Sequence, residues 1–467
     1  MNKARCLTGL AIFAALAVAA VPSTASAWLS TTQKKAIAKV GYDSYMYGYA
    51  PVYMNRNLNR FPADMVLNVQ YLSTELTRTV VKPNADTLYT IIVVDVGTQP
   101  VFIKTPATGS RYFSLELLDG HTNVFGYVGT RATGSGGGTY AIVGPNWNAN
   151  TTPLNRSVDG ILRSGTPKVW VIGRTLVDNE ADVANAVAIQ NQITAQYNDK
   201  VASGTFLPPF NFSKPGDTAP TAIAMTPNAA YFKEFGQVMG AQRPALADKP
   251  LIDSIAKYGV GPGLDPSKTQ SSAVMAELVK GAKSAQAAIV AGVAKQTKAS
   301  AKKNNGWVLF DNVGNYGTDY LTRSIIAEVG VGANRPEESI YPATSHEFNG
   351  KTLNCGSGRV YKIHFNKGET PPVDGFWSIT MYADDQFFIA NPINRFAIGD
   401  RTPNLKYNSD GSLDFWVSKA QPSAARGGAR NWLPAPATTF TLVMRAYIPR
   451  AVTLNGTWKY PKVTKAT

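Results

Sequence analysis

The sequence predicts an α+β protein in which two antiparallel β-sandwich or jelly-roll-like domains are joined by a mainly helical segment. Short strand-like runs broken by Gly, Pro and Asn occupy residues 65–178 and return after residue 336. Between them lie Ala-rich stretches with apolar residues every three to four positions, as in helices. Strand-like runs of the first zone recur in the same order in the second, which indicates two β-domains built on one plan.

The first 27 residues have the pattern of an export signal. A basic start, an apolar run too short to cross a bilayer comfortably, and small residues before Trp28 follow one another. We expect residues 1–27 to be a signal peptide and the protein to be periplasmic or secreted, with no membrane span after signal removal. An uncleaved anchor is the alternative. The mature chain keeps only Cys355, so no intramolecular disulfide is expected.

The charge pattern narrows the expected partners. The formal net charge is +15 at pH 7, but Lys and Arg are scattered without a stripe suited to nucleic acid. We therefore expect no nucleic-acid partner, and instead a small-molecule or glycan ligand. A homo-oligomer and weak attraction to polyanionic envelope polymers are left open.

The predicted N-terminal β-domain covers residues 28–178 and begins with a helix in residues 31–60. Tyr42, Tyr45 and Tyr49 recur at helical spacing on that helix. We expect this stripe to pack on the domain, and a stacking platform for a ligand is the alternative.

The helical segment is predicted over residues 179–335, followed by the C-terminal β-domain over residues 336–467. Its main helices are expected in the Ala-rich residues 178–199 and 271–303, on either side of a Pro-rich connector.

Side-chain alternation assigns the two faces of a repeated strand. In RYFSLELLD, Phe113, Leu115 and Leu117 are expected in the core, opposite a polar-aromatic face that includes Tyr112 and Glu116. GFWSITMY repeats this alternation, with Trp377, Ile379 and Met381 opposite Ser378, Thr380 and Tyr382. The expected matches between the copies are Ser114 with Ser378, Gly129 with Gly399, Arg131 with Arg401, and Arg174 with Arg445.

Long motifs carry a family resemblance. NADTLYT, RYFSLELLDGHTNVFGYVGTRATG and YAIVGPNW resemble the bacterial domain of unknown function 1254. NYGTDYLTRS, GFWSITMYADDQFFIANPINRFAIGDR, DGSLDFWV and NWLPAPATTFTLVMRAYIP resemble its usual C-terminal companion, the domain of unknown function 1214. The resemblance covers nearly all of the mature chain and implies an exported two-sandwich protein, without implying an activity. That family usually carries a charged residue in the second place of N-x-D-T-L-Y, where this chain has Ala85.

Polar residues found in only one copy are the candidates for chemistry. Asp86, Glu116, Asp119 and His121 are the catalytic candidates, because carboxylates and histidine serve as acids and bases. The alternative for DGHTN is a turn whose Asp and Asn bond local amides. No metal motif is present, so no cofactor is expected, although a divalent metal such as calcium is not excluded.

Other candidate reactive groups are fewer. Cys355 with His346 or His364 is a thiol pair only if the fold joins them, and an inert thiol is the alternative. The repeated arginines Arg131 and Arg401 are expected to bond turn carbonyls or a carboxylate such as Asp86 or Asp400, with anion capture as the alternative.

The main functional hypothesis is an exported envelope protein that binds a carbohydrate-like or other small polar ligand in a polar-aromatic cleft. The alternatives are a hydrolase or lyase using a carboxylate/His acid-base pair and a structural envelope protein, so enzymatic activity is left open. The candidate ligand-binding residues are Asn84, Tyr89, Tyr112, Asn123, Arg131, Trp377, Asn391, Arg401, Asn431 and Trp432.

Overall fold

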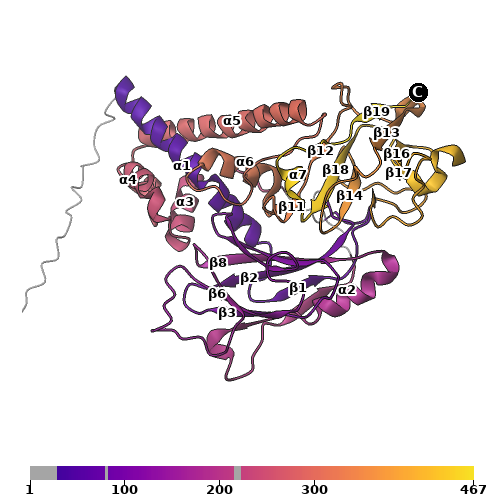
Figure 1. Ribbon diagram of the computed structural model, residues 1–467. Helices are drawn as coiled ribbons and strands as arrows, with labels where there is room; N and C mark the ends of the chain where they lie inside the picture. Colours follow the sequence, from indigo (N-terminus) through magenta and orange to yellow (C-terminus); the bar gives the residue numbers. More distant parts are fainter. Residues whose placement is uncertain (1–28, 79–81, 215–221, 467) are drawn as a thin grey trace, which may run out of the picture.

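The structure, a computed structural model, describes residues 29–78, 82–214 and 222–466. The expected signal peptide lies outside these ranges. The fold is α+β, and Figure 1 shows two β-rich regions with a group of helices beside them. We call the region of β1 to β10 the N-terminal β-unit and that of β11 to β19 the C-terminal β-unit.

The N-terminal β-unit contains two sheets. The six-stranded sheet has the order β10-β1-β2-β8-β4-β5, and the four-stranded sheet has the order β7-β6-β3-β9. The strands of the larger sheet are β1 (Val66–Val69), β2 (Thr87–Asp95), β4 (Phe113–Asp119), β5 (Val124–Gly129), β8 (Lys168–Leu176) and β10 (Pro209–Phe212). Those of the smaller sheet are β3 (Val101–Thr105), β6 (Gly138–Val143), β7 (Gly160–Arg163) and β9 (Thr194–Tyr197).

The C-terminal β-unit also contains two sheets, with the orders β11-β18-β14-β15 and β17-β16-β13-β19. The strands of the first are β11 (Ser339–Ile340), β14 (Trp377–Ala383), β15 (Ala397–Gly399) and β18 (Phe440–Tyr447), with β12 (Ala343–Thr344) also paired to β18. Those of the second are β13 (Val360–Phe365), β16 (Leu413–Ser418), β17 (Trp432–Pro434) and β19 (Val463–Lys465).

The predicted internal repeat is confirmed by strand pairing. β4 lies between β8 and β5, as β14 lies between β18 and β15. Ser114 of β4 pairs with Gly129 of β5 on one side and with Arg174 of β8 on the other. The predicted equivalents have the same register, since Ser378 faces Gly399 and Arg445. β3 pairs with β6 and β9 as β13 pairs with β16 and β19.

The sequence predicted antiparallel sheets, but among the described strands this holds only for the sheet β11-β18-β14-β15, and the other sheets are mixed. β7 runs parallel to β6 and β17 runs parallel to β16, at equivalent edges of the two units. The chain between each pair, residues 144–159 and 419–431, is long enough for the crossover of about a dozen residues that parallel pairing requires. β10 is likewise parallel to β1.

The predicted core faces are confirmed. Phe113, Leu115 and Leu117 belong to one apolar cluster with residues of β3 and β6 from the other sheet of the unit. Trp377 and Ile379 lie in the corresponding cluster of the C-terminal β-unit. The opposite faces of β4 and β14 are therefore turned away from these cores.

The helices form a separate group around α1 (Thr31–Leu58), which Ser30 caps through a reciprocal bond pattern with Gln33. α1 packs along α5, far away in sequence, because glycine lets the two backbones approach closely. A Cβ on Gly41 would lie 2.0 Å from the Leu278 carbonyl oxygen, and one on Gly281 would lie 1.9 Å from that of Ala38. The remaining helices are α2 (Val183–Gln190), α3 (Ala229–Ala241), α4 (Lys249–Ala256), α5 (Ser272–Lys303), α6 (Tyr320–Gly330) and α7 (Ala451–Leu454).

Two expectations about the helices have different outcomes. The tyrosine stripe packs inside the protein, with Tyr45 and Tyr49 buried in the apolar cluster between helices. However, residues 178–199 form only the short helix α2 before strand β9, and β10 also falls in the predicted helical segment. Pairing of β9 with β3 and of β10 with β1 outweighs local helix propensity there. Among the described residues no helix is long and apolar enough to cross a membrane.

Candidate functional site

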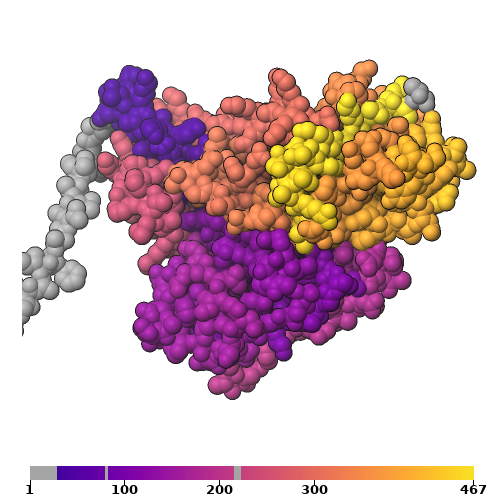
Figure 2. All heavy atoms as spheres, viewed as in Figure 1, coloured from indigo at the N-terminus to yellow at the C-terminus, as the bar shows by residue number. Residues whose placement is uncertain are grey.

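The polar-aromatic faces of the two β-units meet at the interface between them, which is visible as a long seam in Figure 2. The Tyr112 ring lies edge-on to Phe376 and Tyr447, with centroids 5.4 and 5.2 Å away. Aromatic and charged side chains from both units are packed here. We call this group the inter-unit cluster; it contains Asn84, Asp86, Tyr89, Tyr112, Ser114, Glu116, Tyr127, Arg131, Arg174, Asn334, Glu338, Tyr341, Ser378, Thr380, Tyr382, Arg401, Arg445 and Tyr447.

Each unit receives a carboxylate from the other. Arg131 Nε donates to Glu338 Oε2 at 2.5 Å, and Arg401 Nη2 donates to Asp86 Oδ1 at 2.5 Å. The predicted bond between Arg401 and Asp86 is thereby confirmed. Because both acids are almost fully buried, each pair excludes water from most of its surface.

Hydroxyl groups complete both acid sites. Tyr112 Oη donates to Glu338 Oε1 at 2.7 Å, and Ser378 Oγ donates to Asp86 Oδ2 at 2.7 Å. Neither acid is unique to one copy, because Asp86 opens the sequence DTLY and Glu338 opens ESIY in the equivalent place. DTLY and ESIY are only loosely similar, so the sequence alone predicts Asp86 as a residue found in one copy and does not reveal Glu338.

The repeated arginines of β8 and β18 also reach across the interface. Arg174 Nη2 donates to the Gly332 carbonyl oxygen at 3.0 Å, and its Nη1 donates to Asn334 Oδ1 at 3.1 Å. Arg445 Nη2 donates to the Lys82 carbonyl oxygen at 3.1 Å. Arg174 thus binds the segment that leads to Glu338, and Arg445 binds the segment that leads to Asp86.

The two halves of the cluster differ at one position. Glu116 Oε2 accepts from Arg174 Nη1 at 2.8 Å, whereas the equivalent Thr380 Oγ1 accepts from Arg445 Nη1 at 2.7 Å. Within the described residues no carboxylate oxygen lies within 4.0 Å of Arg445, although its side chain is 95% buried. The C-terminal half therefore holds a buried cation without a direct acid partner, and the charge of Asp86, which is bonded to Arg401, acts on it from farther away.

Glu116 is the carboxyl group with the most altered acidity in the cluster. Complete burial raises its pKa to about 7, while the neighbouring Arg174 guanidinium opposes that rise. Tyr127 Oη is 3.4 Å from its Oε1. Glu116 can therefore exchange a proton near neutral pH.

Tyr447 is a buried phenol on which both arginines act electrostatically. Burial raises the pKa of its phenol, nearby Tyr341 and Tyr89 raise it further, and Arg174 and Arg445 oppose the rise. Both guanidinium groups therefore act on one phenol. Tyr89 and Tyr341 are partly exposed, as is Ala85, so the cluster reaches solvent at this end as well as at Arg131 and Arg401, whose side chains are 27% and 19% exposed.

The remaining catalytic candidates lie elsewhere. Asp119 Oδ1 accepts from the backbone nitrogens of His121 and Asn123, each at 2.9 Å, so DGHTN forms a turn held by its own aspartate. His121 Nε2 is 2.6 Å from the Gln242 carbonyl oxygen, and burial lowers the pKa of its ring. Asp86 and Glu116 thus share the inter-unit cluster, while Asp119, His121 and Asn123 belong to this turn.

The predicted ligand-binding residues divide in the same way. Asn84, Tyr89, Tyr112, Arg131 and Arg401 lie in the cluster. The others make local bonds. Trp377 lies in the core beside Phe365 and Phe415, Asn391 bonds the backbone of its own loop, Asn431 bonds the backbone of Lys406 and Asp414, and Trp432 Nε1 donates to Ser418.

The structure also places the residues that were considered for metal and thiol chemistry. In the described part of the chain no group of three or more His, Cys, Asp or Glu side chains is arranged to hold a metal ion. Cys355 is buried, and burial raises the pKa of its thiol to about 12, as in an inert cysteine. His364 bonds Asp414 rather than this thiol.

Comparison with known proteins agrees with the two-part architecture. The family model described as protein of unknown function DUF1254 matches residues 64–197, and that described as protein of unknown function DUF1214 matches residues 338–451. No curated protein matches the chain.

Two solved structures are similar. The VPA0106 protein from Vibrio parahaemolyticus has a TM-score of 0.69 at 22% identity, over 92% of this chain and 100% of that one. An uncharacterized protein from Burkholderia cenocepacia has a TM-score of 0.44 at 12% identity, over 93% and 95% of the two chains. The first of these similarities supports the fold.

Proposed function

Since this chain belongs to the proteins that join an N-terminal DUF1254 domain to a C-terminal DUF1214 domain, we propose a function from their interface: binding of a small, polar, carbohydrate-like ligand that carries an anionic group. The ligand site is the partly exposed end of the inter-unit cluster, around Tyr89 and Tyr341. We also propose that the protein acts in the cell envelope after export, in the periplasm or outside the cell, as its N-terminal sequence predicts.

One observation carries the proposal. Arg174 and Arg445 act on the same buried phenol, and Arg445 has no carboxylate within 4.0 Å among the described residues. A carboxylate or similar group entering beside Tyr89 would supply the missing negative charge. The tyrosine rings at this end offer apolar faces against which a sugar ring packs.

The repeated architecture supports this placement. We propose that the units are two β-sandwich domains joined by the helical segment. Apolar residues from both sheets of the N-terminal β-unit share one cluster, which supports a sandwich. A ligand bound between the units would then contact equivalent strands of both.

Binding is tested by thermal shift with matched probes. Glucuronate and glucose differ only in the carboxylate, and a ligand at a hundred times its Kd adds about 2.7 kcal/mol to the free energy of unfolding. We expect glucuronate to raise the melting temperature and glucose to do so less or not at all. Equal responses, or none to either, would overturn the proposal.

Variants locate the site. Arg445→Met should abolish the response to glucuronate, and Tyr89→Ala provides a second test that leaves the buried arginines in place. Arg450→Met is the matched control, because Arg450 is exposed and paired with Asp374 at the surface. If Tyr89→Ala and Arg445→Met both respond as the wild type does, the ligand binds elsewhere.

A hydrolase or lyase is the second candidate function, favoured by the buried Glu116 with its pKa of about 7. Asp86 is the other acid of the cluster, since His121 makes its bonds in a separate turn. Turnover of sugar, ester and amide libraries by wild type, lost in Glu116→Gln, would establish catalysis. If no probe binds or reacts and the protein forms large stable assemblies, the structural envelope role is favoured instead.

A further inference from the structure

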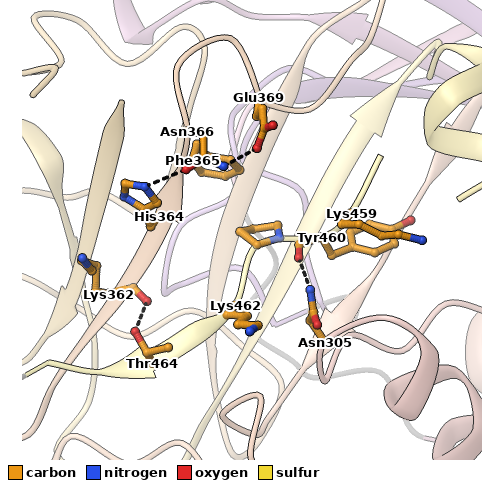
Figure 3. A pocket seen from close by; sticks show the side chains of 11 residues that line it. Asn305, Lys362, His364, Phe365, Asn366, Glu369, Lys459, Tyr460, Lys462 and Thr464 are labelled. Atoms are coloured by element: carbon orange, nitrogen blue, oxygen red, sulfur yellow. Dashed lines mark hydrogen bonds between the residues drawn. The ribbon is translucent and has the colours of Figure 1, made fainter. Parts of the chain in front are cut away.

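A pocket lies in the C-terminal β-unit and is lined by none of the residues of the inter-unit cluster. It has a volume of about 420 Å³ and opens beside β13 and β19 (Figure 3). Pro461 and Tyr460 contribute apolar surface, and Asn305 follows helix α5 directly. Of the residues singled out in the sequence, His364 lines this pocket, although it was considered there only as a partner for Cys355.

Cationic side chains dominate its lining. Lys362, Lys459 and Lys462 contribute three ammonium groups, and His364 adds an imidazole. The one carboxylate among the lining residues is Glu369. A concave site with this excess of positive groups attracts anions.

A chain of hydrogen bonds orients the imidazole. His364 Nδ1 lies 2.6 Å from Asp414 Oδ1, and its Nε2 lies 3.2 Å from Asn366 Oδ1. The Asn366 amide nitrogen donates to Glu369 Oε2 at 2.6 Å, which fixes the orientation of that amide (Figure 3). Both ring nitrogens therefore face oxygen atoms, which fixes the orientation of the ring.

The lysines keep charge available for a ligand. Lys362 Nζ is 3.9 Å from Asp414, at the outer limit of an ion pair, and Lys462 Nζ packs over the Phe348 ring at 4.9 Å. Lys459 Nζ instead donates to the Gly456 carbonyl oxygen at 2.6 Å. Of the three, Lys362 and Lys462 are less firmly held by other oxygen atoms.

We propose that this pocket binds a small organic oxyanion, a phosphate ester or a carboxylate, through Lys362 and Lys462, beside the ring of His364. The volume fits a ligand of monosaccharide size. The site is separate from the inter-unit cluster, so occupation of one does not require the other.

Calorimetric titration tests the site and its ligand class. Glucose 6-phosphate, gluconate and glucose share a six-carbon body but carry a phosphate, a carboxylate and no charge. We expect one or both anions to bind and glucose not to bind at concentrations up to about 10 mM. Preference for glucose 6-phosphate identifies a phosphate site and preference for gluconate a carboxylate site. No heat of binding from either anion would overturn the proposal.

Charge-matched variants separate a built site from diffuse attraction. Lys362→Met and Lys462→Met, each made alone, should weaken anion binding severalfold, whereas Lys459→Met, which removes the same single charge, should change it little. An equal loss in Lys459→Met would show that surface charge alone is responsible. Circular dichroism confirms that each variant is folded.

Histidine resonances provide a readout of position. The chain has only three histidines, so their ring signals are resolved in a carbon-proton NMR spectrum and His364 is assigned with His364→Gln. Glucose 6-phosphate or gluconate should shift the His364 signal while leaving buried His121 unchanged. Binding that moves His121 and not His364 would contradict this site. If the His364 signal still shifts in Tyr89→Ala, the pocket binds the anion independently of the proposed ligand site at the interface.

Discussion

Asp86 accepts a hydrogen bond from Arg401 across the interface between the two β-units, with 2.5 Å between Oδ1 and Nη2. Glu338 accepts from Arg131 in the opposite direction. Equivalent arginines thus bind acids supplied by the other unit. This exchange joins the units reciprocally and places the polar-aromatic faces against each other.

Breaking one of these pairs should be strongly destabilising. Arg401→Met leaves Asp86 as an unpaired buried charge, which costs about 3–5 kcal/mol when a buried pair loses one partner. Urea unfolding measures the loss. The double variant Asp86→Leu/Arg401→Met should be more stable than Arg401→Met alone, because no charge is stranded.

Arg450→Met is the control for that experiment. Arg450 and Asp374 are 59% and 60% exposed, so losing their pair should cost less than about 1 kcal/mol. A double variant no more stable than Arg401→Met would contradict the explanation by a stranded charge.

Glu116 should make stability fall as pH rises from 4.5 to about 7. Burial raises its folded-state pKa to about 7, whereas the carboxyl ordinarily ionises at 4.5. In this window the folded protein holds a proton that the unfolded chain has lost, so raising the pH favours unfolding. Urea unfolding of wild type and Glu116→Gln across this range isolates the effect. Parallel pH profiles of the wild type and the variant would show that Glu116 does not cause the decrease in stability.

His121 should reduce the stability of the folded protein as the pH falls, which is opposite to the effect of Glu116. Burial, aided by Arg323, lowers its folded-state pKa below the ordinary 6.5, while Asp119 opposes that change. Below pH 6.5 the histidine therefore binds a proton in the unfolded chain but not in the folded protein. The free energy of unfolding then decreases as the pH falls. Thermal melts between pH 5 and 7.5 should show a shallower acid decline in His121→Gln. An unchanged decline would assign it to other groups.

Equivalent glycines should both be intolerant of substitution, and Gly129 more so, because its φ of +138° is one that other residues rarely adopt. A Cβ on Gly129 would lie 2.2 Å from the Phe113 carbonyl oxygen, and one on Gly399 would lie 2.2 Å from that of Trp377. Gly129→Ala and Gly399→Ala should each cost roughly 1–3 kcal/mol, because adjacent strands must separate. Chemical denaturation of both is compared with Gly136→Ala, where no atom lies within 4 Å of the new methyl group. Wild-type stability in either strand variant would show that the close approach is absent.

Part of the site followed from local pattern. Period-two alternation placed Tyr112 and Glu116 opposite the core, because successive strand side chains point to opposite faces. The position of Arg401 after a strand-ending glycine also predicted that it could bond turn carbonyls or a carboxylate such as Asp86 or Asp400. The repeat did not identify Glu338, since the acids lie in short segments with few matching residues. Pocket residues such as Lys462 and His364 were equally hidden, because their proximity depends on pairing β13 with β19.

The sequence by itself determined the α+β class, the long helices α1 and α5, the repeated strand order and the buried face of each repeated strand. These follow from local periodicity, which a chain carries in any stretch of ten or so residues. Tertiary structure alone decided that α1 packs on α5, that β9 and β10 complete the N-terminal sheets, and that the two polar faces close on each other. Such contacts join segments far apart in the chain, so their free energy depends on packing and burial that local pattern does not specify.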